Sequence, residues 1–167
     1  ESALAVRETL PGEAGAAYVL AFFCSLQDRG FRIFPIHRLL GGGDDSHTRD
    51  IATALRDAHR VEPLAPDSGP DDILRRLRQA GERHFALVTR EDPPLLVSLA
   101  VSENPAGDSL EDFDTVLLQK QVFSKKLGLS SEDIASGAVG YTSDAAEAFR
   151  QVRTAQAKAA FLLNPLK

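Results

Sequence analysis

The sequence predicts an α+β fold, with a mixed, mostly antiparallel sheet and helices packed mainly on one of its faces. Two pairs of apolar segments, each joined by a short polar connection, indicate β-hairpins. Single segments with helical spacing of their apolar residues follow these pairs. Because hairpins place consecutive strands antiparallel, the separate helices are then expected to cover the apolar side of the sheet.

The first pair comprises residues 17–24 and 31–40. We expect the second arm to be an apolar strand whose end carries a proline, His37 and Arg38. A buried strand that stops in this way can deliver an imidazole and a guanidinium to a site. This stretch is therefore the first candidate for function.

Several segments have the features of helices, at residues 1–9, 47–58, 70–80, 110–127 and 143–152. Pro70 and Gly81 mark the start and the stop of the third of them. The apolar stripe of the fourth is interrupted at Gln119–Gln121, and its start is open between Leu110 and Asp114. Ser143 is expected to cap the last one.

The remaining strands are predicted from short apolar runs. Residues 84–89 and 95–101 form the second hairpin. Residues 59–64 are predicted as a short strand that Pro63 limits to an edge or an end. A short strand is expected near residues 139–141, and a buried one at residues 159–163.

Composition limits the classes of function. The net charge of -5 would repel phosphate backbones, so a nucleic-acid partner is not expected. The only cysteine, Cys24, excludes an internal disulfide and a multi-cysteine zinc site. The other histidines lack the spacing of metal ligands, and no metal site is predicted.

The chain of 167 residues is long enough for one sizeable core, and we expect a single α+β domain over residues 1–167. No apolar run approaches the ~18 residues that cross a bilayer, and no secretory signal is visible. We therefore expect a cytoplasmic protein without membrane contact. Because the chain begins at Glu1 without Met, already in a helical pattern, we expect a fragment truncated at both ends of a longer protein.

His37 and Arg38 are the candidate catalytic and anion-binding residues. Histidine titrates near neutrality, and arginine binds carboxylate or phosphate with two parallel hydrogen bonds. The alternative is a strand end whose polar side chains simply reach solvent. The run Gly41–Gly43 does not form a phosphate-binding P-loop, because Asp44 and Asp45 follow it in place of Lys and Ser or Thr.

Several short segments, taken in order, form a wider pattern: Tyr18–Phe23, Ile33–Leu40, Val116–Leu129, Tyr141 with Asp144–Ala148, and Ala159–Pro165. Their order and spacing resemble the bacterial and archaeal family called domain of unknown function 1015. Its members typically carry Ala-Asp-Gly-His-His-Arg-Tyr before a helix that begins Glu-x-Ala-Leu. Glu1–Leu4 resembles that helix start, which implies that the motif lies directly upstream of residue 1.

The resemblance also implies a hypothesis on chemistry. The family motif is similar to one in ParB-like and sulfiredoxin-like folds, some of which bind nucleotides and include a free-serine kinase. A full-length protein would then use ATP or ADP with Mg to transfer phosphate to a small hydroxylated substrate. Arg38 and Glu1 would bind the anion, and His37 would orient or move a proton. Ile36 departs from the family pattern, which often has Thr at this position.

The rival hypothesis is a non-catalytic structural or dimerisation module. In this case the chain supports the missing N-terminal portion of the same protein, or forms a homodimer, and carries no catalytic residue. Burial of His37 and Arg38 by internal contacts would favour this hypothesis.

Overall fold

The structure is a computed structural model that describes residues 33–41, 48–99 and 113–165, together with Ala21, Phe23, Ser25 and Gly30. The chain divides into two compact units, residues 1–32 and residues 33–167. The predicted helix at residues 1–9, most of the hairpin arm at 17–24, and Glu1 lie outside the described residues. The described strands and helices all belong to the second unit.

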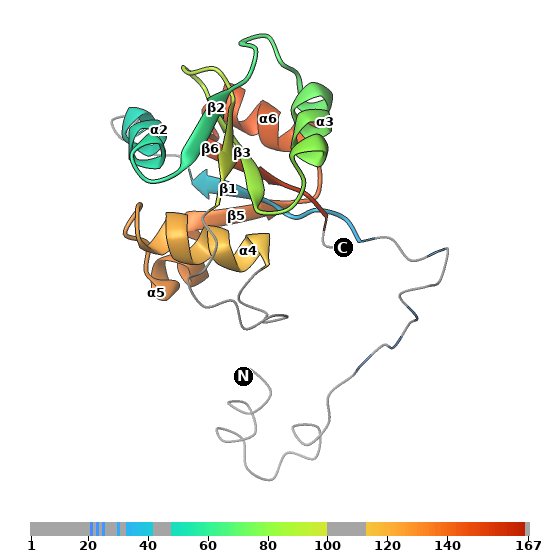
Figure 1. Ribbon diagram of the computed structural model, residues 1–167. Coiled ribbons are helices and arrows are strands. Elements are labelled where there is room, and N and C mark those ends of the chain that lie inside the picture. Colours follow the sequence, from blue (N-terminus) through green and yellow to red (C-terminus); the bar gives the residue numbers. More distant parts are fainter. Residues whose placement is uncertain are drawn as a thin grey trace. The chain divides into compact units, whose positions relative to one another are not determined.

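In the described part of the chain, six strands form one sheet in the order β2-β4-β3-β6-β1-β5, and all neighbouring strands run antiparallel (Figure 1). Their bounds are β1 His37–Gly41, β2 Arg60–Pro63, β3 His84–Thr89, β4 Leu95–Ser98, β5 Val139–Thr142 and β6 Ala157–Leu163. The predicted α+β class with an antiparallel sheet is confirmed.

The described residues form five helical segments beside the sheet. They are α2 Thr48–Arg56, α3 Pro70–Ala80, α4 Asp114–Leu117 continued by the π-helix η4 Leu118–Ser124, α5 Ser131–Asp133 continued by the π-helix η5 Ile134–Ala138, and α6 Ala145–Arg153. Within the described part of the chain, none of these helices has the length and apolar character needed to span a membrane.

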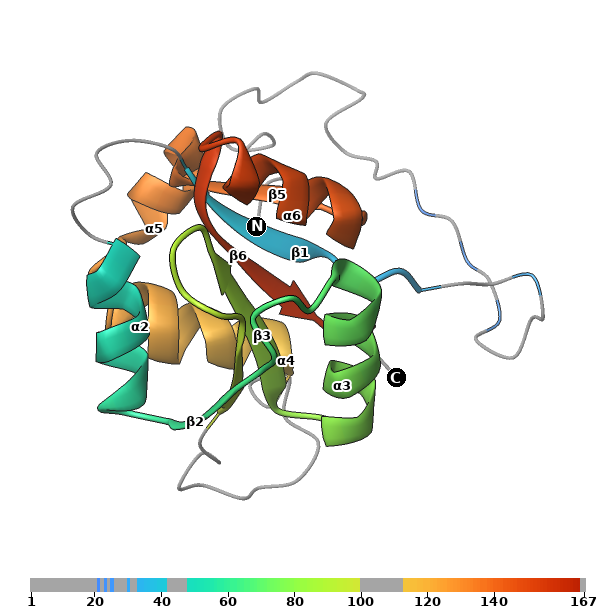
Figure 2. The same ribbon diagram turned by 90° about the horizontal axis from the view of Figure 1, so that it is seen from above.

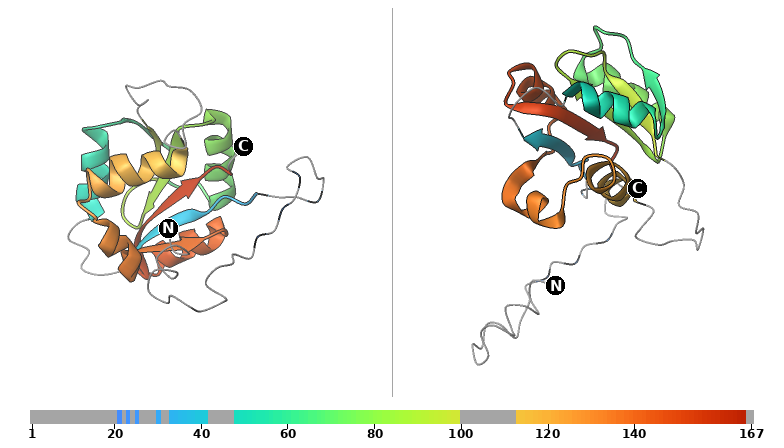
Figure 3. Two further views of the ribbon diagram at one scale, coloured as in Figure 1. Left: turned by 90° about the horizontal axis from the view of Figure 1, so that it is seen from below. Right: turned by 90° about the vertical axis from the view of Figure 1, so that its left-hand side faces the viewer.

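The helices cover both faces of the sheet, and the prediction that they pack mainly on one face is wrong. On one face lie α3 and α6 (Figure 2). They bury Ile73, Leu77 and Ala148 against the strands. On the other face lie α2 and the α4–η4 helix, which are seen from below in Figure 3. They bury Leu55 and Leu118.

The reason for this double coverage lies in β6. Residues Ala159–Leu163 are apolar at every position, and each is at most 1 % exposed. Alternate side chains of a strand point to opposite faces, so a continuous apolar run needs a helix layer on each side. Phe161 faces the α4–η4 layer and Leu162 faces the α3–α6 layer.

The π-helical geometry of η4 explains the interrupted apolar stripe at Gln119–Gln121. The N–H of Lys125 donates to the carbonyl of Lys120, and that of Leu127 donates to Val122, which are five-residue spacings. This longer repeat brings Leu118, Val122 and Phe123 to the buried side. A stripe drawn for an ordinary α-helix therefore misses part of the buried face.

β1 starts later than predicted, at His37 instead of Phe31, so His37 and Arg38 open the strand rather than end it. β1 lies between β6 and β5 in the sheet. A proline cannot donate to either neighbour, and strand pairing accordingly begins after Pro35.

Phe161 should be one of the most sensitive positions of the core. Its ring is fully buried, with centroids 5.7 Å from Phe85 and 5.0 Å from Phe123 in an edge-on contact. We expect Phe161→Ala to lower the free energy of unfolding by about 3–5 kcal/mol, because it removes a buried ring and leaves a cavity. Urea denaturation would measure this. Phe113→Ala, at a partly exposed ring, is the control, and a similar loss in both variants would contradict the packing described.

Candidate functional site

His37 is fully buried at the start of β1, with 0 % of its surface exposed. Its Nδ1 atom accepts a hydrogen bond from the backbone N–H of Leu163 at 3.1 Å. The neutral ring therefore carries its proton on Nε2. Nε2 is also buried and has no hydrogen-bond partner among the described residues. His37 thus ties the beginning of β1 to the end of β6.

The surroundings of His37 oppose its protonation. Burial, followed by the positive charge of Arg38, lowers its pKa from 6.5 to about 4, and the carboxylate of Asp144 opposes this in part. The imidazole is therefore neutral near pH 7. A protonated Nδ1 would also lose the ability to accept the hydrogen bond from Leu163.

Arg38 is half-buried and is held by two neighbours. Its Nη1 donates to the carbonyl of Ile36 at 2.6 Å, and its Cζ lies 4.7 Å from the centroid of the Tyr141 ring. Tyr141 stands directly opposite Arg38 in the pairing of β1 with β5. Burial lowers the pKa of Arg38. No carboxylate of the described residues forms an ion pair with this guanidinium.

The two candidate side chains lie on opposite faces of the sheet. His37 shares its face with Leu39, which packs in the α3–α6 layer. Arg38 shares its face with Leu40, which packs against the α2–η4 layer. The structure therefore does not bring His37 and Arg38 together on one ligand, although they are adjacent in sequence.

The other predicted features fall outside this geometry. Glu1 lies outside the described residues. Within residues 33–41, 48–99 and 113–165, no three His, Cys, Asp or Glu side chains lie close enough to hold a metal ion.

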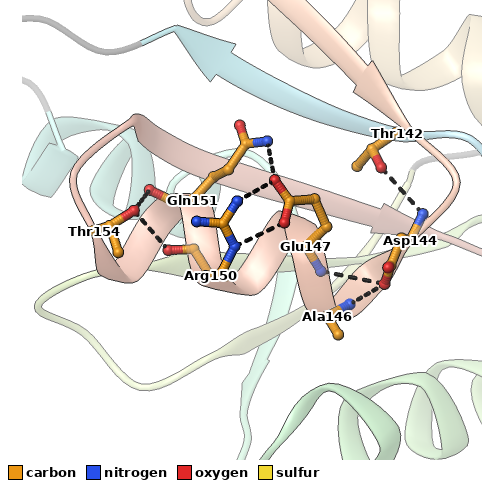
Figure 4. Close-up of polar contacts among 7 residues, drawn as sticks. All are labelled: Thr142, Asp144, Ala146, Glu147, Arg150, Gln151 and Thr154. Carbon is orange, nitrogen blue, oxygen red and sulfur yellow. Dashed lines mark hydrogen bonds and ion pairs between the residues drawn. The ribbon is translucent and has the colours of Figure 1, made fainter.

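A polar network at the start of α6 was missed by the sequence analysis (Figure 4). Asp144, and not Ser143, caps the helix, since its Oδ1 accepts from the N–H groups of Ala146 at 2.9 Å and Glu147 at 3.2 Å. The backbone N–H of Asp144 donates to the hydroxyl of Thr142 at 3.1 Å. Asp followed three residues later by Glu is the sequence signal of such a cap.

The network continues along α6 at its surface. Arg150 donates to the carboxylate of Glu147 through Nε at 2.8 Å and Nη2 at 2.6 Å, and Gln151 donates to it at 2.7 Å. These hydrogen bonds, that from Arg150 first, lower the pKa of Glu147. Both carboxylate oxygens of Glu147 accept from side chains of the same helix, so the network stabilises α6 and offers no open site.

Together, the two helix layers enclose one antiparallel sheet, and this arrangement defines an α+β unit in the described part of the chain. The family model described as "Protein of unknown function (DUF1015)" matches residues 1–116. This is more than half of the chain, and the protein belongs to that family.

The match confirms the resemblance stated from the sequence, while the segments at residues 141–165 lie beyond the matched stretch. No curated protein matches the chain. No solved structure matches it either. The ParB-like motif upstream of residue 1 stays a prediction.

His37 should make the stability of the protein depend on pH. Its pKa falls from 6.5 in the unfolded chain to about 4 in the fold, so the unfolded state takes up a proton first as the pH drops. The contribution of His37 to the free energy of unfolding is therefore present above pH ~6.5 and falls by on the order of 3 kcal/mol towards pH ~4.

The measurement is urea denaturation between these two pH values, compared with His37→Asn. Asparagine can offer its Oδ1 atom to the N–H of Leu163 but does not titrate. The difference in the free energy of unfolding between the wild type and His37→Asn should change steeply with pH. Parallel pH profiles would contradict a buried, neutral His37.

The assignment of the cap is tested at two adjacent positions. Asp144→Ala removes the acceptor of the Ala146 and Glu147 N–H groups and should lower the free energy of unfolding by about 1 kcal/mol. Ser143→Ala, at the residue that the sequence favoured, should change it by less than ~0.5 kcal/mol. Thermal or urea unfolding of both variants decides between the two caps, and a larger loss at Ser143 would reverse the assignment.

Proposed function

We propose that this chain serves as a non-catalytic structural module of a DUF1015 family protein, which supports the portion expected upstream of residue 1. One observation carries the proposal. His37, the candidate acid–base residue, is fully buried and uses Nδ1 to bind the backbone of Leu163. This hydrogen bond joins the start of β1 to the end of β6.

The requirements of acid–base catalysis also favour a structural role. A general acid or base works best with a pKa near the operating pH and has to reach its substrate. His37 has a pKa of about 4 and no exposed surface. Arg38, which would neutralise phosphate, points to the other face of the sheet, where it rests on Tyr141.

The second candidate is the nucleotide-dependent phosphotransferase, and the charge of Arg38 favours it. This half-buried guanidinium has no carboxylate partner among the described residues. In this candidate, Arg38 binds a phosphate of ATP or ADP with Mg, and the upstream motif supplies most of the chemistry. A small hydroxylated molecule accepts the phosphate. His37 does not share the site, since its side chain lies on the opposite face.

Nucleotide titration of the longer protein that carries the upstream motif separates the two candidates. Isothermal titration with Mg–ATP and Mg–ADP is compared for the wild type and for Arg38→Ala. The matched control is Arg153→Ala, which also removes an arginine that lies over an aromatic ring, with its Cζ 4.9 Å from the centroid of Phe149.

If the chain is a structural module, we expect Arg38→Ala and Arg153→Ala to change nucleotide affinity by less than about twofold, or no binding to be measurable. A tenfold or larger loss in Arg38→Ala alone, about 1.4 kcal/mol, would overturn the proposal in favour of the phosphotransferase.

A further inference from the structure

The two edge strands of the sheet differ in character. β2 carries Arg60 and Glu62, both exposed, and ends on Pro63, which has no N–H to donate. Glu62 is further engaged by Arg76 at 2.7 Å. Charges and proline are the means by which proteins keep an edge from pairing with another chain. The β2 edge is therefore protected.

β5, at the other edge, has none of these features. Its residues Val139, Gly140, Tyr141 and Thr142 include no charge and no proline. It pairs with β1 on one side and has no strand on the other in the described part of the chain. The side chain of Tyr141 is 56 % exposed. An uncharged open edge is a template for another strand.

Exposed apolar side chains lie on this edge and beside its end. Tyr141 of β5 and Ile36, which precedes β1, are two of the six large apolar residues that are exposed in the described part of the chain. His37 stands opposite Thr142 in the pairing of β1 with β5, so Ile36 lies next to the end of β5. Both residues add apolar surface that a partner can cover.

We infer that β5 pairs antiparallel with β5 of a second copy of this chain, so that one sheet continues across two molecules. The inference rests on the proposed structural role and names the partner. Among the described strands, only another β5 offers an uncharged free edge, because β2 is protected. Pairing β5 with itself is isologous and uses up both edges, whereas pairing it with β2 would leave free edges and propagate.

The symmetry sets the register. A two-fold axis perpendicular to the sheet keeps each residue on the same face in both copies, and opposite residues of an antiparallel pair share a face. One residue must then stand opposite itself. We place Tyr141 there, because its ring has Arg38 over one face and can cover its other face with the same ring of the second copy.

The charges allow this arrangement. Each Arg38 Cζ lies 4.7 Å from its own ring centroid. Stacked ring centroids are ~4.5–7 Å apart, so two guanidinium groups on the outer faces of the stacked rings are separated by more than the ~8 Å Debye length at physiological salt, which weakens their repulsion. β5 itself adds no charge to the interface.

The first test is the oligomeric state of the 167-residue chain. Sedimentation velocity should give twice the monomer mass of 18.0 kDa. Tyr141→Lys, which places two like charges opposite each other, should weaken the dimer by at least ~100-fold and give a monomer. Pro63→Lys adds the same charge to the β2 edge and should leave the dimer intact.

A wild-type chain that stays monomeric up to about 0.5 mM would overturn the interface. A dimer that survives Tyr141→Lys would overturn it as well. Neither result bears on nucleotide binding, which tests the structural role separately.

The second test fixes the register by a disulfide. In a Cys24→Ser background, Tyr141→Cys should cross-link two chains on treatment with oxidised glutathione. Opposite Cα atoms of an antiparallel pair are ~4.5–5.5 Å apart, within the ~4.4–6.8 Å that a disulfide spans. Arg60→Cys, on the protected edge, is the control. Equal cross-linking at both positions, or none at residue 141, would contradict the pairing.

Discussion

The structure depends on the burial of β6 from both sides. This strand lies between β3 and β1, and its residues Ala159–Leu163 are apolar without interruption. Each face then needs its own cover, which the α3–α6 layer provides on one side and the α2–η4 layer on the other. The aromatic cluster around Phe161 and the π-helical geometry of η4 both follow from this requirement, because the longer repeat places Val122 and Phe123 against the strand.

The same strand also holds the side chain of His37 in place. β6 ends with the N–H of Leu163, and the imidazole at the start of β1 accepts it. The pKa of His37 is low because a charged ring at this position would be buried next to Arg38. A residue type that is common in active sites is here engaged in holding two strands together. The side chain of Arg38, one position later, lies on the opposite face of the sheet, where its guanidinium group lies over the ring of Tyr141 in the edge strand β5.

The two edges of the sheet show a second level of organisation. The charged residues and the proline of β2 hinder pairing with another strand at its edge. β5 carries no charge or proline, and it contains a glycine and the exposed ring of Tyr141. Asp144 caps α6 directly after β5, and its backbone N–H donates to the hydroxyl of Thr142, so the helix that follows fixes the end of the open edge in position. In the described part of the chain, this edge carries the exposed ring of Tyr141, which fits the pairing inferred for β5.

The sequence by itself determined the class of fold, the second hairpin, the short strand at residues 59–64, and the bounds of α3 between Pro70 and Gly81, because these depend on local periodicity and turn chemistry. It also identified the family. Only the tertiary structure decided the rest. The strand order made β6 central and showed that its apolar run needs two helix layers. The pleat separated His37 from Arg38, since neighbours in a strand face opposite sides. Burial turned a titratable histidine into a neutral structural one, and burial depends on residues far away in the sequence, such as Leu163.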